Sequence, residues 1–220
     1  MAITHKFTRT LPPPSATHAD GFVFLLSTGW FTQADQGAAG SPIDGGANSI
    51  LDGGGDLVVF SDDTLLNKIP VEVVNFVTGV SPVAQVWVRL PTYSVGDSIT
   101  IAKDDSQTVQ PVPSSTYGRN NVWQDYLCVY HLEDYTDSTG NADLTLHQGN
   151  APTKVDGGYD FDGTGLLSSQ PSGLPNLDNS PAPITIQAWG RIRDLDQGEL
   201  YVASVGAQTG TGGYDVPTGI

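Results

Sequence analysis

The stretch AQVWVRLP, residues 84–91, is the clearest secondary-structure signal in the chain. One face carries Ala84, Val86, Val88 and Leu90, and the other carries Gln85, Trp87 and Arg89. A period of two residues is typical of a β-strand that buries one face. We therefore expect a half-buried strand in which Trp87 covers the opposite face of the sheet. A second interpretation makes Trp87 a stacking platform for a sugar ring.

Short apolar or alternating runs continue on both sides of this strand. The expected strands lie at residues 22–26, 56–60, 70–76, 98–102, 125–132, 143–147, 157–161, 165–169, 184–193 and 199–206. No window has a convincing 3.6-residue helical period. Short strands at roughly ten-residue spacing, with turn residues between them, are typical of β-sandwiches. We therefore predict an all-β fold.

The acidic residues also indicate a chain rich in turns. Of the 24 acidic residues only three are glutamate, at positions 72, 133 and 199. Aspartate favours turns because its short carboxylate accepts hydrogen bonds from nearby backbone amides, whereas glutamate favours helices. The 26 glycines and 15 prolines among 220 residues support the same conclusion.

The net charge narrows the classes of partner. A charge of −15 argues against nucleic-acid binding, which needs clustered Lys and Arg, and against adhesion to an anionic membrane. No segment approaches the roughly 18 apolar residues of a membrane span, so we expect no membrane insertion. The first fifteen residues also lack the apolar stretch of a secretory signal, so we expect no export on such a signal.

Composition changes along the chain suggest three parts. The run Pro12-Pro13-Pro14 favours an extended conformation, and we predict an N-terminal arm over residues 1–15. Residues 103–120 are polar and contain two prolines, which indicates a linker or a domain edge. We therefore predict a small β-sandwich domain over residues 16–118 and a second β-sandwich domain over residues 119–220.

Four segments in or next to the second predicted domain carry a resemblance to a known family through their sequence and their order. They are YGRNNVWQDYLCVYHL at 117–132, DSTGNADLTL at 137–146, GGYDFDGTGLL at 157–167 and ITIQAWGRI at 184–192. Together they resemble laminin-G-like, concanavalin A-like lectin domains, which implies a jelly roll that binds carbohydrate. Fewer strands follow Asn120 than a complete domain of this kind has, so we expect the natural chain to continue or a partner to supply the rest.

Three upstream segments carry a second resemblance. GGDLVVFSDD at 54–63, IPVEVVNF at 69–76 and AQVWVRLP at 84–91 resemble a β-domain family of unknown function. That family often precedes concanavalin-like domains in bacterial surface proteins and phage virion proteins. It often has Tyr-Tyr-Gly near the next strand, where this chain has ITIAKDDSQ at 99–107, so the end of that sheet departs from the family pattern.

The sequence holds no convincing catalytic motif. Concanavalin-like glucanases place carboxylates as E-x-D-x-x-E on one strand. The nearest segment, EDYTD at 133–137, has Tyr135 where the second acid should stand. There is also no G-x-S-x-G motif, no catalytic Cys–His motif and no zinc-ligand spacing. We therefore predict a protein without enzymatic activity, and we interpret His131 as a packed side chain.

Two binding features follow from the resemblance and from strand periodicity. Laminin-G-like domains often hold Ca²⁺, and Asp137, Asp160 and Asp162 are the acids within the matching motifs. Asx-turns are the alternative for Asp137 and Asp162, so the metal ligands stay open and no cofactor is assigned.

Trp189 alternates out of phase with the apolar residues 184, 186, 188 and 192, so we expect it on the opposite face as a candidate carbohydrate platform. The alternative is that a loop or further strands cover Trp189.

These observations lead to one leading hypothesis and two rivals. The leading hypothesis is a bacteriophage structural protein on a tail, fibre or capsid, assembled in the host cytoplasm. It would form a homo-oligomer, contact other virion proteins and bind host surface glycan or a neighbouring subunit. The first rival is a bacterial adhesin or polysaccharide-binding module on the cell surface, and the second is an accessory domain of a glycan-active enzyme.

Overall fold

The computed structural model describes residues 1–19, 21–32, 41–155, 158–162, 164–169, 185–188, 208–209 and 213–214. The chain divides into two compact units, residues 1–173 and 174–220. Nearly all regular structure described is β-strand, which confirms the all-β class. The predicted domain boundary at residue 118 falls inside the first unit, and the division into two domains stays a prediction.

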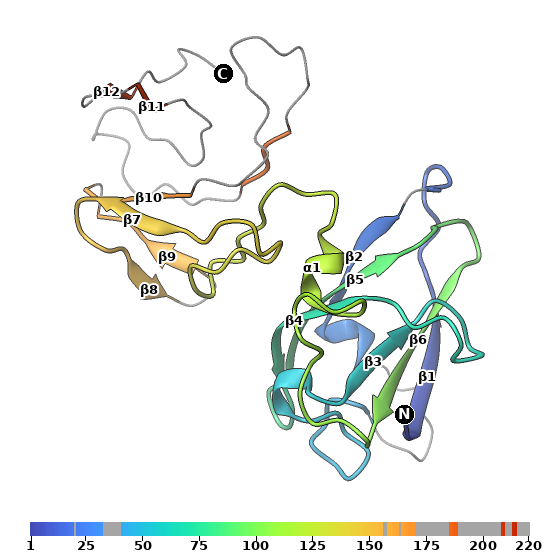
Figure 1. The fold of residues 1–220 in the computed structure, drawn as a ribbon. Helices are drawn as coiled ribbons and strands as arrows, with labels where there is room; N and C mark the ends of the chain where they lie inside the picture. Colours follow the sequence, from blue (N-terminus) through green and yellow to red (C-terminus); the bar gives the residue numbers. More distant parts are fainter. Residues whose placement is uncertain are drawn as a thin grey trace. The chain divides into compact units, whose positions relative to one another are not determined.

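Two three-stranded antiparallel sheets form the N-terminal part of the first unit (Figure 1). The first sheet has the order β1 (Ile3–Thr10), β6 (Ser98–Asp104) and β3 (Leu57–Phe60). The second has the order β2 (Phe22–Ser27), β5 (Val83–Leu90) and β4 (Val71–Val77). Strands β2 to β6 confirm five of the runs expected from the sequence. Short 3₁₀ turns lie at Thr28–Trp30 and Asp52–Gly54.

One apolar core lies between the two sheets. The alternation of residues 84–91 is confirmed, because Val86 and Val88 are fully buried and Ala84 and Leu90 nearly so. The same cluster contains Leu26 of β2, Val59 of β3, Val71 of β4, and Ile99 and Ile101 of β6. Two sheets that bury one face each against the other give a sandwich-like arrangement, which leaves their outer faces available for other contacts.

The prediction of an extended arm over residues 1–15 is wrong for its first part. Residues 3–10 form β1, which pairs with β6 along the edge of the first sheet. Phe7 of this strand packs against the core, and the amide of Ala2 donates to the Asp104 carboxylate at 2.7 Å. The ladder with β6 satisfies backbone groups that an arm would leave in water, and Leu11 is buried just beyond it.

Residues 119–169 are held together mainly by turns and short hairpins. The helix α1 (Arg119–Val122) is followed by β7 (Thr145–Gln148), which pairs with β10 (Leu166–Ser168). A second hairpin joins β8 (Thr153–Val155), which was not predicted, to β9 (Gly158–Asp160). The strand expected over residues 125–132 is wrong, because these residues form no ladder. The amide of Val129 instead donates to the carboxylate of Asp137 at 2.9 Å.

Little of the second unit is described. The described strands there are β11 (Gln208–Thr209) and β12 (Gly213–Tyr214), which pair with each other. Residues 185–188, part of the strand expected over 184–193, carry no strand, and Ile186 exposes 49% of its surface rather than being buried. The strand expected at 199–206 lies entirely outside the described residues. In the part of the chain that is described, no helix is long and apolar enough to cross a membrane.

Candidate functional site

The outer face of the second sheet carries an aromatic residue flanked by an apolar and an acidic one. The strand register places Trp87 of β5 opposite Leu25 of β2 on one side and opposite Glu72 of β4 on the other. Residues 119–138, which we call the docking segment, contact this face. In Figure 1, α1 at the start of the docking segment lies beside strands of this sheet.

Aromatic rings form the apolar part of this contact. The ring of Trp123 lies 5.2 Å from that of Trp87, and the His131 ring stacks on Trp87 at 5.9 Å with an interplanar angle of 23°. Trp123 exposes only 5% of its surface. The interpretation of Trp87 as a residue that covers the outer face of the sheet is confirmed, and so is the interpretation of His131 as a packed histidine.

A buried carboxylate lies at the centre of the contact. Glu72 exposes 5% of its surface and accepts hydrogen bonds from three side chains of the docking segment. The indole Nε1 of Trp123 donates to Oε2 at 2.5 Å, His131 Nε2 lies 2.9 Å from the same oxygen, and Ser138 Oγ donates to Oε1 at 2.5 Å. We call this group of four residues the junction cluster: Glu72, Trp123, His131 and Ser138.

The electrostatics of Glu72 favour its charged form. Burial by itself would raise the pKa of Glu72, because it removes water from the carboxylate. Hydrogen bonding and charge from His131, with further hydrogen bonds from Ser138 and Trp123, outweigh that effect and hold the pKa below its ordinary value. A carboxylate is an acceptor only, so His131 Nε2 must carry a hydrogen in this arrangement.

The geometry of the junction cluster differs from that of a catalytic triad. In a triad the histidine lies between the nucleophile and the acid, so that it can take the proton of the hydroxyl. Here the serine and the histidine bind different oxygens of the same carboxylate. Ser138 is also nearly fully buried. The arrangement therefore joins the docking segment to the sheet.

A second contact and a close backbone approach fix the ends of this interface. Arg89, buried on β5, forms an ion pair with Asp125 of the docking segment. Gly118 immediately precedes α1, and a Cβ atom at this position would lie 2.2 Å from the carbonyl oxygen of Val112. A side chain at residue 118 would therefore push the start of α1 away from its position.

The DSTGN motif is built around the buried side chain of Asp137. Its two carboxylate oxygens accept hydrogen bonds from the amides of residues 129, 139, 141 and 142 and from the hydroxyl of Thr139. These bonds outweigh burial and lower the pKa of Asp137. The Asx-turn interpretation of Asp137 is confirmed, and Ser138 is carried into the junction cluster by this turn.

The three candidate calcium ligands do not converge on one site. Asp162 is exposed and accepts bonds from Thr164 and Asn150, which confirms its Asx-turn. Asp160 lies in β9. Across the described ranges, no group of three or more His, Cys, Asp or Glu side chains is placed to hold a metal ion. Because protein donors occupy both oxygens of Asp137, its carboxylate does not fit a Ca²⁺ ligand.

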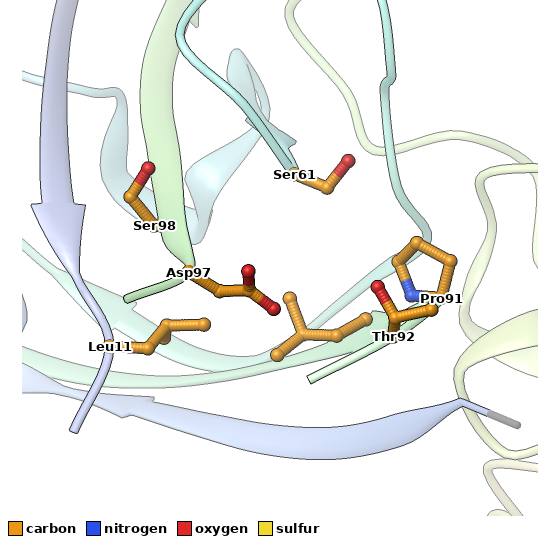
Figure 2. Close-up of a pocket in the computed structure, with 7 residues that line it drawn as sticks. Leu11, Ser61, Pro91, Thr92, Asp97 and Ser98 are labelled. Carbon is orange, nitrogen blue, oxygen red and sulfur yellow. The ribbon is translucent and has the colours of Figure 1, made fainter. Parts of the chain in front are cut away.

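Two small cavities lie in the first unit. Figure 2 shows the smaller one, of about 90 Å³, which Ser61, Thr92, Asp97 and Ser98 line with polar atoms. The Asp97 carboxylate there caps a turn by accepting from the amide of Ser94 at 2.7 Å. The larger cavity, of about 150 Å³, adjoins the junction cluster and is lined by Glu72, Val73, Val74, Arg119, His131, Glu133, Asp134, Thr136 and Ser138.

Sequence reasoning missed the junction cluster, and its own candidate binding residue is not tested by the structure. Trp189, the predicted carbohydrate platform, lies outside the described residues. Glu72 gave a weak signal, since it is one of only three glutamates and stands in a mainly apolar strand. Its three partners lie 51 to 66 residues away in the chain, beyond the reach of any local pattern. No known protein family, curated protein or solved structure matches the chain.

Proposed function

We propose that this chain is a non-enzymatic structural protein of a phage particle, exposed on a tail, fibre or capsid. In this proposal the first β-sandwich domain includes β1 and ends at residue 118, and residues 119–220 form a second β-sandwich domain, a concanavalin A-like jelly roll. The second domain binds a host surface glycan or a neighbouring subunit, and the protein acts as an oligomer among other virion proteins.

The observation that carries the non-enzymatic part is the junction cluster. Glu72, His131 and Ser138 are residue types that often perform chemistry, but here their hydrogen bonds join one segment of the chain to another. Glu133, the acid nearest to a glucanase pattern, is paired with Lys154 at 3.1 Å on the surface. Asp137, at the end of that segment, is buried and holds a turn.

The virion assignment is supported by composition and by the order of the sequence motifs. A β-domain followed by lectin-like motifs is the order seen in phage and bacterial surface proteins. A net charge of −15 favours solubility at high copy number. A bacterial surface adhesin shares the motif order, so the two assignments differ in where the protein is found and not in its domains.

A binding and turnover assay on the purified chain tests the activity directly. The proposal predicts that glycans on an array, or purified virion subunits, retain the chain, and that a panel of β-glucans is not hydrolysed. Glu133→Gln should leave binding unchanged. Turnover on any β-glucan that Glu133→Gln abolishes would show that the chain is a glycoside hydrolase.

A further inference from the structure

The junction cluster joins two parts of the chain through groups that change charge with pH. Glu72 belongs to the sheet, whereas Trp123, His131 and Ser138 belong to the docking segment. The docking segment is in turn bound to the residues that follow it in the chain. The hydroxyl of Tyr130 donates to the Ala142 carbonyl at 2.7 Å, and Lys154 Nζ donates to the Leu132 carbonyl at 2.7 Å.

We propose that the outer face of the β2-β5-β4 sheet is a docking surface for residues 119–138 of the same chain, and that protonation of Glu72 releases this segment. Above the pH at which Glu72 titrates, the docking segment stays bound to the sheet and holds residues 139–169 in a fixed orientation. Below it the segment leaves the sheet while the sandwich core stays folded. Release of the docking segment does not depend on which glycan or subunit the protein binds.

The hydrogen-bond chemistry of Glu72 gives the direction of the switch. An ionised carboxylate can accept all three donors at once, and bonds to a charged acceptor are about twice as strong as neutral ones. A protonated carboxyl must donate one hydrogen bond itself. Ser138 can rotate to accept that hydrogen, but the indole N–H of Trp123 cannot accept, and an imidazolium cannot either. Protonation therefore weakens two or more of the contacts that hold the docking segment.

The sign of the linkage follows from the lowered pKa of Glu72. The group binds its proton more weakly when docked than when the segment is released. Docking is therefore fully stabilised above the ordinary glutamate pKa and is lost as pH falls through the docked value. The cluster that fills the space between the two sheets consists of apolar side chains, so protonation of Glu72 removes none of its contacts.

The surroundings of Glu72 allow a proton to reach it without unfolding. The cavity of about 150 Å³ adjoins Glu72 and is large enough to hold water. Among the described residues, the titratable or charged groups that bond to Glu72 or line this cavity with it are His131 of the docking segment, Arg119 of α1, Glu133 and Asp134. Trp87, the residue of β5 that pairs with Glu72 in the ladder, does not titrate.

Fluorotryptophan labelling of the whole chain gives a local measure of whether the docking segment is bound to the sheet. The four tryptophans are Trp30, Trp87, Trp123 and Trp189. Trp87 and Trp123 report docking, while Trp30 packs on Phe24 at the edge of the sandwich core and reports global folding. The ¹⁹F spectrum should be recorded between about pH 7.5 and about pH 3, a range that spans the titration of imidazole and carboxylates.

The proposal predicts that the resonances of Trp87 and Trp123 move together towards the position of solvent-exposed tryptophan as pH falls, while that of Trp30 stays unchanged. Glu72→Gln should show the low-pH spectrum already at neutral pH. Glu133→Gln, the matched control in the same cavity, should keep the transition. His131→Gln keeps a hydrogen-bond donor but removes the charge that lowers the pKa of Glu72, so its midpoint should move to higher pH.

Three outcomes would overturn the proposal. The first is that the Trp123 resonance does not move before that of Trp30, which would mean that the joint opens only when the whole domain unfolds. The second is that Glu133→Gln removes the transition, which would place the titrating group elsewhere. The third is that the midpoint of His131→Gln equals that of the unmodified chain. The measurement on His131→Gln still tests the proposal if Glu72→Gln does not fold.

Discussion

At the scale of the residue, the buried carboxylate of Asp137 organises the turn that brings Ser138 to the junction cluster. It accepts four backbone amides and one hydroxyl, and it is fully buried. Asp162 forms a similar turn at the surface, with its own Thr two residues later. The two aspartates therefore share a local motif and differ in burial.

This difference predicts unequal effects of removing the two carboxylates. Asp137→Ala leaves several amides without an acceptor in a dry site, so it should lower the free energy of unfolding by about 3 kcal/mol or more. Asp162→Ala should change it far less, because water replaces the lost acceptor. Urea denaturation of both variants, followed by tryptophan fluorescence, measures the difference. Equal effects would contradict the structural role assigned to Asp137.

Trp189 provides a second prediction at this scale, based on its place in the sequence. If it is a carbohydrate platform, Trp189→Ala should keep a near-normal melting temperature and lose glycan binding. If it is covered by a loop or by other strands, the same change should cost about 3–5 kcal/mol of stability. Thermal denaturation and glycan-array binding of this one variant separate the two interpretations, and loss of stability alone would rule out the platform.

At the scale of the element, β2 offers a direct test of the sandwich core. Leu26 is fully buried between the sheets, and its neighbour Leu25 is 37% exposed on the outer face. Leu26→Ala should destabilise the protein by about 2–5 kcal/mol, because it removes packing and leaves a cavity. Leu25→Ala should cost about 1 kcal/mol or less. A larger effect of Leu25→Ala in chemical denaturation would mean that the sheet buries the opposite face.

Periodicity predicted some elements of the fold and failed for others, for identifiable physical reasons. Residues 84–91 alternate between apolar and polar side chains, and they form β5 as expected. Residues 3–10 were predicted as part of an arm because of the prolines at 12–14, and polar side chains on both faces of this edge strand gave no periodic signal against that prediction. Residues 125–132 alternate like a strand, but the carboxylate of Asp137 takes the amide of Val129. A competing side-chain acceptor of this kind is invisible to a pattern of hydrophobicity.

The candidate site was even less accessible to prediction. Glu72 was expected only as a member of a strand, because nothing nearby in the sequence indicates that its carboxylate is buried. The donors that make its burial tolerable are brought to it by tertiary structure, 51 or more residues later. His131 could be recognised as a packed residue but its acidic partner could not. Long-range polar clusters of this kind have no periodic signal.

At the scale of the whole molecule, hydrogen-bonded carboxylates should control stability in acid. The acids whose pKa is lowered in the fold are Asp52, Asp62, Glu72, Asp104, Asp137 and Asp162. Each contributes stability that is fully present above its unfolded pKa, near 4, and is lost as pH falls through the lower folded value. The net charge of −15 acts in the opposite direction, since acid relieves repulsion, but salt screens charges spread over the surface.

We therefore expect stability to fall steadily as the solution is acidified below about pH 4.5 in about 0.15 M salt. Urea midpoints measured at a series of pH values test this expectation. A midpoint that rises on acidification would show that relief of charge repulsion dominates over the loss of the hydrogen-bonded carboxylates.

The central functional proposal, a structural protein of a virus particle, can be tested most directly by mass spectrometry of particles purified from infected cells. The proposal predicts that the chain copurifies with intact particles at a fixed ratio to the other structural proteins, and that this ratio survives a salt wash. If peptides of the chain are missing from the particles and occur only in the cell envelope of the host, the protein is a cellular adhesin and the proposal is wrong.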